Sequence, residues 1–287
     1  MALRLLVVEG NMRDARERHL ATFGKICGQS YADTLTALAP DAICDICMPA
    51  DDGANLPDAG GLEGYDGVAL TGSALNMYDG GPAITRQLDL ARAVFASHTP
   101  FFGSCWGLQI ASAATGGDVI KNPRGRGAGF ARGITATQAG AAHPLLAGRA
   151  AVFDAPCVHI DIVARPPGDA DVLAFNAHAP VQAAEIRHDG GVFWGVQYHP
   201  EYALDELAAI IERRMVPFVA EGLFADETQG HAYCADLRAL HKDPGRTDVA
   251  WRYGVAREII EAELRLTELR NWLEHYVRPV KSKRGRA

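Results

Sequence analysis

One cysteine of this chain lies between two glycines in a pattern that could make it a nucleophile. Cys105 is the centre of the motif Gly-Ser-Cys-Trp-Gly at residues 103–107, after the apolar residues 99–102 and before helix formers at 108–114. A strand, a sharp turn and a helix at this spacing make a nucleophile elbow, because the glycines permit a strained turn that exposes the central side chain. The positive end of the helix dipole would favour the thiolate there.

A second motif supplies what a thiolate needs. His199 and Glu201 belong to the motif Tyr-His-Pro-Glu at 198–201, which follows the strand-like residues 192–197. A histidine can act as the base, and a carboxylate two residues later can orient the imidazole. Alone, a buried cysteine is usually a small apolar residue and a His-Pro-Glu motif is often a turn. Together, at the carboxyl ends of strands where open α/β sheets place their sites, they predict a Cys-His-Glu triad.

The order of apolar segments predicts the elements that position these residues. Residues 3–8, 42–48 and 65–70 have the apolar runs of buried parallel strands, and helices are expected at 13–23 and 84–97. This alternation predicts an α/β fold with a doubly wound parallel sheet. From 129 to 195 the expected strands are short and separated by turns, which indicates a mixed or antiparallel extension of the sheet. A helix is then expected at 204–218.

The C-terminal region has a different pattern. Apolar residues recur every three or four positions between Asp248 and Val277, which predicts one amphipathic helix of about eight turns. Such a stripe usually packs against the core of its own chain. A homodimer contact through this helix, or a lid over the site, are the two alternatives.

Composition excludes several classes of protein. The 287 residues carry a net charge of −7, which argues against a nucleic-acid partner. No stretch reaches the 18 to 20 apolar residues of a membrane span, and the start resembles no signal peptide, so we expect a cytoplasmic protein. The pair Cys44 and Cys47 lies in a strand-like run and has no second pair, so we expect ordinary strand cysteines, no metal and no cofactor.

The two motifs resemble those of the class I glutamine amidotransferases. The similarity is close at 103–109 and 195–201, weaker over about 1–224, and best to the stand-alone branch similar to the amidotransferase domain of GMP synthase. That branch also contains γ-glutamyl peptidases. The resemblance implies a flavodoxin-like three-layer sandwich with a central, mostly parallel sheet. We accordingly expect an amidotransferase-like domain at 1–224 and a helical C-terminal extension at 225–287.

The resemblance also implies roles for further residues. The family hydrolyses the side-chain amide of glutamine through a γ-glutamyl thioester. Its oxyanion donors correspond to the backbone of Gly72, Ser73 and Trp106. Its substrate-binding positions correspond to Gln109 and to the segment Val158, His159, Ile160 and Asp161. Here Ser73 replaces the usual second glycine and Ile160 replaces a small residue.

Two substrates are compatible with this chemistry. The sequence favours glutamine. Because the chain has no phosphate-binding loop with which to activate an acceptor, the released ammonia would pass to a separate synthetase subunit. The alternative is a γ-glutamyl peptidase or hydrolase that acts on γ-glutamyl amides or peptides. A non-catalytic module is disfavoured by the complete Cys-His-Glu set. An α/β-hydrolase is disfavoured because its acid precedes its histidine.

Overall fold

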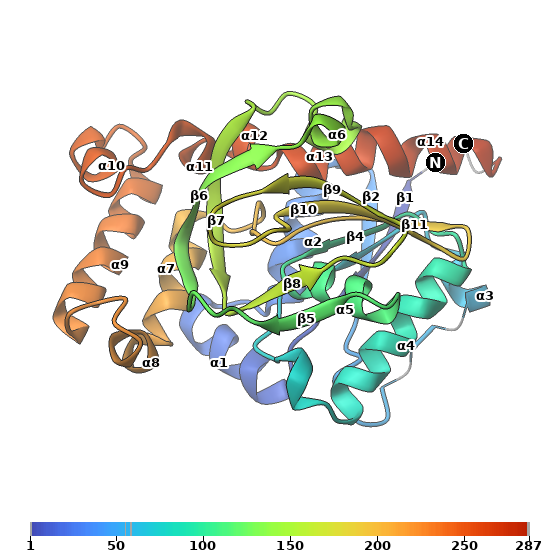
Figure 1. Ribbon diagram of the computed structural model, residues 1–287, viewed down its shortest axis with the longest axis horizontal. Helices are drawn as coiled ribbons and strands as arrows, with labels where there is room; N and C mark the ends of the chain where they lie inside the picture. Colours follow the sequence, from blue (N-terminus) through green and yellow to red (C-terminus); the bar gives the residue numbers. More distant parts are fainter. Residues whose placement is uncertain (1, 55, 58, 286–287) are drawn as a thin grey trace.

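The computed structural model describes residues 2–54, 56–57 and 59–285. Within them, nine strands form one sheet in the order β2-β1-β3-β4-β11-β10-β9-β6-β7, and β5 pairs with β8 in a separate ribbon (Figure 1). The strands are β1 (Leu3–Val8), β2 (Ala42–Cys47), β3 (Gly67–Leu70), β4 (Phe101–Ser104), β5 (Asp118–Lys121), β6 (Gly127–Ala136), β7 (Val152–His159), β8 (Asp161–Arg165), β9 (Ala170–Phe175), β10 (Ala183–His188) and β11 (Gly191–Val196).

The sheet has a parallel half and an antiparallel half. Strands β2, β1, β3, β4 and β11 run parallel to one another, whereas β10, β9, β6 and β7 each pair antiparallel with their neighbours. The apolar runs of the first half suit strands that are buried on both faces. The expected parallel core and its antiparallel extension are both confirmed.

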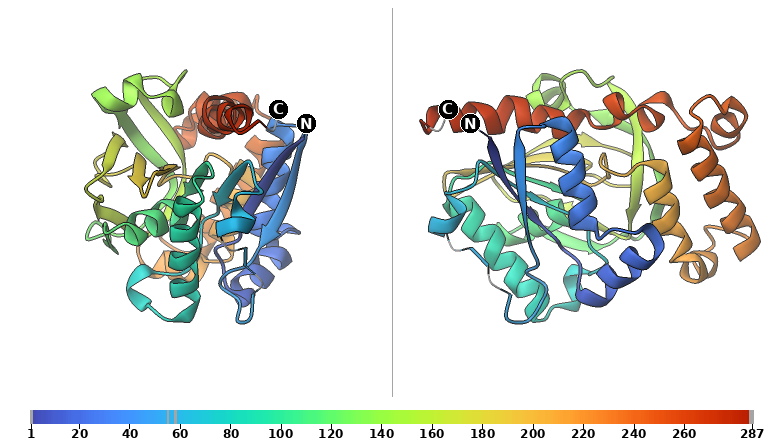
Figure 2. Two further views of the ribbon diagram at one scale, coloured as in Figure 1. Left: turned by 90° about the vertical axis from the view of Figure 1, so that its right-hand side faces the viewer. Right: turned by 180° about the vertical axis from the view of Figure 1, so that it is seen from behind.

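Helices cover both faces of the parallel half, as the two views of Figure 2 show. Leu3, Leu5 and Val7 of β1 pack with α2 and the C-terminal helices on one face, whereas Leu6 and Val8 pack with α4 and α5 on the other. This is the expected three-layer, flavodoxin-like sandwich. The helices of the first 220 residues are α1 (Arg13–Phe23), α2 (Cys27–Leu38), α3 (Ala59–Leu62), η1 (Met77–Asp79), α4 (Pro82–Ala96), α5 (Trp106–Ala114), α6 (Gln138–Ala142), η2 (Pro144–Leu146), α7 (Leu204–Glu212) and α8 (Met215–Ala220).

The single helix expected at 204–218 is wrong. The structure has two helices, α7 and α8, separated at Arg213 and Arg214. Pro217 explains the break, because a proline ring inside a continuous helix would clash with the carbonyl four residues earlier, here that of Arg213. The break leaves Arg213 and Arg214 in the wall of the pocket described below.

The single eight-turn helix expected at 248–277 is also wrong. Gly254, with φ 59°, ends α10, and the extended backbone of Glu261 separates α11 from α12. The apolar residues of this stripe therefore belong to two hydrophobic clusters. Val255 and Ile259 pack with α7 and with α9 (Glu227–Lys242), and Trp272 packs against the face of the sheet that α2 covers. The helices are α9 (Glu227–Lys242), α10 (Thr247–Tyr253), α11 (Arg257–Ile260), α12 (Ala262–Arg265), α13 (Thr267–Trp272), the π-helical turn η3 (Leu273–Val277) and α14 (Arg278–Lys283).

The last helices are part of the core of the chain. Trp272 and Val277 are fully buried against Gly67 of β3, where an added Cβ would come within 2.9 Å of the Trp272 ring. Lys281 Nζ donates to the Ala2 carbonyl and to Asp66 Oδ2, so α14 is tied to the N-terminal strand region. The expected division at residue 224 stays a prediction, and residues 286–287 of the expected extension lie outside the described residues.

We expect Trp272→Ala to lower the free energy of unfolding by about 3–5 kcal/mol, since it removes a large, fully buried side chain. Chemical denaturation monitored by circular dichroism measures this. Trp251→Ala is the matched control, because Trp251 is 87% exposed and its loss should change stability by less than about 0.5 kcal/mol. Equal effects of the two substitutions would contradict the packing described here.

Candidate active site

The nucleophile-elbow geometry is present at Cys105. Its backbone has φ 53° and ψ −99°, between the end of β4 and the start of α5. Such a conformation costs a non-glycine residue about 1–3 kcal/mol and persists only where the surroundings enforce it. The Cys105 N–H donates to the Val196 carbonyl of β11 (2.7 Å), which fixes the turn to the neighbouring strand.

The glycines on either side of Cys105 are required by close packing. A Cβ at Gly103 would come within 2.7 Å of Gly107 Cα, and a Cβ at Gly107 would come within 2.7 Å of the Leu70 carbonyl. The helix α5 can therefore approach the strands only if both positions lack side chains. This is the physical reason for the spacing that the sequence shows.

His199 and Glu201 follow β11 and lie beside the elbow. His199 Nδ1 is 2.6 Å from Glu201 Oε1, and both side chains are buried. Ser104 Oγ donates to Glu201 Oε2 (2.9 Å), and its oxygen lies 3.1 Å from Tyr31 OH. Because the single Ser104 hydroxyl proton goes to Glu201, Tyr31 must be the donor to Ser104. A buried chain of hydrogen bonds thus orients the carboxylate that orients His199.

The charge state of His199 depends on its neighbours. Burial alone would lower its pKa, but the charge of Glu201, and then the charge and hydrogen bond of Cys105, raise the pKa from 6.5 to about 10. Tyr202 stacks on the imidazole with ring centroids 4.0 Å apart. His199 thus lies between the Glu201 carboxylate and Cys105, and both groups favour its protonated form.

The turn after β3 lies against the other side of His199. A Cβ at Gly72 would come within 2.6 Å of His199 Cε1, so this position has room only for glycine. Asn11 Oδ1 accepts from the Ala74 N–H (2.9 Å), and Ser73 Oγ donates to the Gly10 carbonyl (2.9 Å). The segment that carries Gly72 and Ser73 is thereby fixed to the loop after β1.

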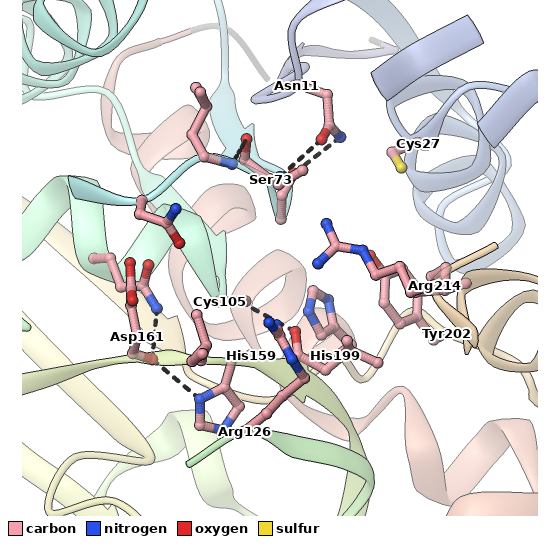
Figure 3. Close-up of a pocket in the computed structure, with 18 of the residues that line it drawn as sticks. Asn11, Cys27, Ser73, Cys105, Arg126, His159, Asp161, His199, Tyr202 and Arg214 are labelled. Atoms are coloured by element: carbon pink, nitrogen blue, oxygen red, sulfur yellow. Dashed lines mark hydrogen bonds between the residues drawn. The ribbon is translucent and has the colours of Figure 1, made fainter. Parts of the chain in front are cut away.

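One pocket of about 560 Å³, partly open to solvent, contains most of the predicted site residues (Figure 3). Trp106 lies outside its lining, fully buried, and donates from Nε1 to Gln87 Oε1 (2.8 Å). Glu201 lies behind His199, also outside the lining. The predicted residues in the lining are Gly72, Ser73, Cys105, Gln109, Val158, His159, Ile160, Asp161 and His199.

Gln109 holds the segment that was expected to contact substrate. Its Nε2 donates to the Asp161 carbonyl (3.0 Å) and to Gln197 Oε1 (3.2 Å). The Val158 carbonyl lies 3.9 Å from Cys105 Sγ. The Ile160 carbonyl accepts from the Asn122 N–H (2.8 Å). The segment is thus fixed at both ends and in the middle.

Burial shifts the pKa values of His159 and Asp161 in opposite directions. Burial lowers the pKa of His159 to about 3, so this imidazole is neutral. Its Nδ1 lies 3.0 Å from the Asp161 carbonyl. Burial raises the pKa of the Asp161 carboxyl, while contacts from Tyr78 and from the Met77 backbone oppose the shift.

Several pocket residues were not expected from the sequence. Asn11, Cys27, Tyr202, Arg126, Arg213 and Arg214 all contribute to its lining. Tyr202 directly follows Glu201, and Arg213 and Arg214 form a charged pair directly after the apolar helix α7, so both patterns were visible in the sequence. Asn11 and Cys27 come from a loop and a helix whose contact with the site depends on the fold.

Two features are absent from the described residues. The part of the chain that the structure describes contains no group of three or more His, Cys, Asp or Glu side chains placed to hold a metal ion. No helix in the same residues has the length and apolar character needed to span a membrane. The pair Cys44 and Cys47 lies in β2 as two free cysteines.

Comparisons with known proteins agree with this geometry. The family description "Glutamine amidotransferase class-I" matches residues 46–217. A γ-glutamyl-L-1-hydroxyisopropylamide hydrolase of Pseudomonas sp. is 33% identical over 96% of this chain and 94% of its own length. A GMP synthase of Leifsonia xyli subsp. xyli is 30% identical over 62% of this chain, which spans only about a third (34%) of that protein. A glutamine amidotransferase structure from Thermotoga maritima superposes with TM-score 0.61 at 15% identity, covering 96% of this chain and 99% of that one.

The fold and the cysteine elbow define an amidohydrolase-type α/β enzyme. This chain belongs to the class I glutamine amidotransferase family. Its substrate is accordingly glutamine or another γ-glutamyl compound. The family resemblance and the fold class inferred from the sequence are both confirmed.

We expect Gly72→Ala to lower kcat/KM for amide hydrolysis by at least about 100-fold, because the new methyl group would displace the His199 ring. Steady-state kinetics with the folded variant measures the effect. Gly168→Ala is the matched control, since no atom lies within 4 Å of its added Cβ. Normal activity of Gly72→Ala would show that His199 does not need its present position.

We expect Glu201→Gln to lower the pKa of His199, because it removes the negative charge that stabilises the imidazolium. An NMR titration of the histidine rings measures this, with exposed Glu17→Gln as the control. In the unmodified protein the folded pKa, about 10, exceeds the ordinary 6.5. The protonated His199 therefore stabilises the fold fully below about pH 6.5, and this contribution is lost as pH rises through 10. An unchanged His199 pKa in Glu201→Gln would contradict the assigned pairing.

Proposed function

We propose that this protein hydrolyses γ-glutamyl amides, with Cys105 as nucleophile, His199 as acid and base, and Glu201 as the group that orients His199. The observation that carries the proposal is the strained elbow at Cys105 beside the buried His199–Glu201 pair, whose Nδ1–Oε1 distance is 2.6 Å. A protonated imidazole beside a thiolate is the resting state of a cysteine nucleophile.

In the first half of the reaction, Cys105 Sγ attacks the γ-carbonyl carbon and forms a carbon–sulfur bond. The carbonyl oxygen becomes an oxyanion, for which we propose the backbone N–H groups of Ser73 and Trp106 as donors. As the carbon–nitrogen bond breaks, the proton on His199 Nε2 passes to the departing amine. The product on the enzyme is a γ-glutamyl thioester.

In the second half, water attacks the thioester carbonyl. Neutral His199 takes a proton from the water, the carbon–sulfur bond breaks, and glutamate leaves with Cys105 regenerated. Glu201 holds the Nδ1–H tautomer through both halves. Ser104 and Tyr31 act as positioning residues, because they fix the Glu201 carboxylate and contact no reacting atom.

The residues that we propose to bind the glutamyl part of the substrate carry groups that suit it. Asp161 contributes a carboxylate to the pocket wall, which suits the α-ammonium group of a γ-glutamyl substrate. Gln109 and the backbone of Val158 to Asp161 form the adjoining wall. We propose Gln109, Val158, His159, Ile160 and Asp161 as the lining of the glutamyl side, with Ile160 narrowing it.

The amide of a substituted amine is preferred over glutamine as the substrate. The relative from Pseudomonas sp., whose name specifies a γ-glutamyl hydroxyisopropylamide, matches this chain over 96% of its length. The match to the GMP synthase covers only 62%. The sequence alone favoured glutamine as the substrate. The near full-length similarity to the amide hydrolase favours the substituted amide instead.

A glutamine-hydrolysing subunit is the second candidate. The similarity to GMP synthase favours it, and it would require a separate synthetase subunit. A homodimer and a cytoplasmic location also remain proposals. Most of the apolar stripe on which the dimer was predicted packs within two hydrophobic clusters of the chain itself, so a dimer would need a different surface.

Substrate preference distinguishes the two candidates. We expect kcat/KM for γ-glutamyl-L-1-hydroxyisopropylamide to exceed that for glutamine, with the amine released in step with glutamate. Cys105→Ala should reduce both rates to background. Cys234→Ala is the control, because Cys234 is a buried cysteine outside the pocket lining. Faster turnover of glutamine than of the amide would favour the amidotransferase subunit instead.

A further inference from the structure

Three arginines line a part of the pocket that the proposed reaction leaves without a role. Arg126 comes from the loop before β6, and Arg213 and Arg214 come from the break between α7 and α8. In Figure 3, Arg214 and Tyr202 lie on one side of Cys105, and Asp161 lies on the other. The pocket therefore has an acidic end and a basic end.

Two of these arginines have partners within the protein. Arg126 donates from Nε and Nη2 to the Glu221 carboxylate (2.7 and 3.0 Å), and its guanidinium lies over the Phe218 ring. Arg213 contacts His19 Nδ1 through Nη1. Their positions are fixed, and Glu221 neutralises the charge of Arg126.

Arg214 is different. Among the described residues, no carboxylate and no carbonyl accepts a hydrogen bond from its guanidinium, although the residue is partly buried. Burial, and then the charges of Arg213 and Arg126, lower the pKa of Arg214. An arginine nevertheless stays charged, and a partly buried cation without a counter-charge is unfavourable. Among the described residues, Arg214 thus lacks an anionic partner.

The place of Arg214 relative to the reacting atoms indicates where that anion would come from. His199 gives its proton to the departing amine, so the amine part of the substrate must extend along the His199 side. Tyr202 stacks on His199 with ring centroids 4.0 Å apart, and Arg214 lines the pocket on the same side of Cys105 as Tyr202 (Figure 3). Asp161 lines the pocket on the opposite side of Cys105. The guanidinium therefore faces the amine part.

We propose that Arg214 binds a carboxylate of the substrate, and that the preferred substrates are γ-glutamyl amides whose amine part is an amino acid. A planar guanidinium binds a carboxylate through two parallel hydrogen bonds, which an alcohol cannot reproduce. The inference rests on the proposed function, because it assigns the substrate class of that same site. The α-carboxylate of the glutamyl group offers the same chemistry, and the experiment separates the two sources.

A matched pair of substrates tests the proposal. γ-Glutamyl-L-alanine and γ-glutamyl-L-1-hydroxyisopropylamide differ only in a carboxylate against a hydroxymethyl group. We expect Arg214→Gln to raise KM for the alanine compound about 10- to 100-fold, with kcat changed far less. KM for the hydroxyisopropylamide should change less than about twofold, and Arg214→Lys should recover part of the loss. Arg257→Gln, on an arginine that is 80% exposed, is the control and should change neither.

Each outcome has a definite meaning. A similar rise in KM for both substrates and for glutamine would support carboxylate binding by Arg214 but assign it to the glutamyl α-carboxylate. An unchanged KM for all three substrates would overturn the proposal.

Binding to the inactive Cys105→Ala variant keeps this test separate from the proposed function. Calorimetry should show tighter binding of γ-glutamyl-L-alanine than of the hydroxyisopropylamide, and Arg214→Gln should remove the difference. Were the unmodified enzyme to hydrolyse neither compound, the proposed function would fail while this binding difference could still be measured. Equal binding of the two compounds, unaffected by Arg214→Gln, would overturn the inference whatever the activity.

Discussion

The conformation of one residue constrains the rest of this structure. Cys105 has φ 53° and ψ −99°, a region that costs an ordinary residue about 1–3 kcal/mol. The cost is offset because β4 and α5 are held in place on both sides: the Cys105 N–H bonds β11, and Gly103 and Gly107 let the helix touch the strands. The parallel half of the sheet, packed between two helical layers, supplies the rigidity that this requires.

The positions of the charged groups at the site depend on the same strands. Strand β11 runs parallel to β4, so its carboxyl end brings His199 beside the elbow. Ser104, the residue before Cys105, donates to Glu201, and Tyr31 of α2 reaches Ser104 across the core. One short segment therefore both carries the Cys105 thiol and fixes the carboxylate that contacts His199. A shift of β4 relative to β11 would disturb both groups together.

The structural elements that short sequence motifs determine could be predicted from the sequence. The elbow, the His-Pro-Glu motif, the parallel strands and the helix at 13–23 depend on local patterns of glycine, apolar residues and charge, and the structure has these elements. The helices at 204–218 and 248–277 were predicted as continuous because apolar spacing alone cannot show a break. Pro217 and Gly254 were visible signals for those breaks. Helix α2 has few strong signals, and its role in holding Glu201 through Tyr31 follows only from tertiary packing.

The pocket shows the same limit of prediction from the sequence. Residues inside the motifs, such as Gln109 and His199, could be predicted, whereas Arg126 and Arg214 come together only when the loop before β6 meets the end of α7. We therefore expect the shared motifs to determine the chemistry and the surrounding pocket walls to determine the choice of substrate.

The most direct test of the central claim is to trap the acyl-enzyme. Acid quenching of the enzyme during turnover of a γ-glutamyl amide, followed by mass spectrometry of its peptides, would identify the modified residue. The account predicts one γ-glutamyl group on the peptide that contains Cys105, labile to hydroxylamine as a thioester is. An active enzyme without this modification, or with the group on another residue, would contradict it.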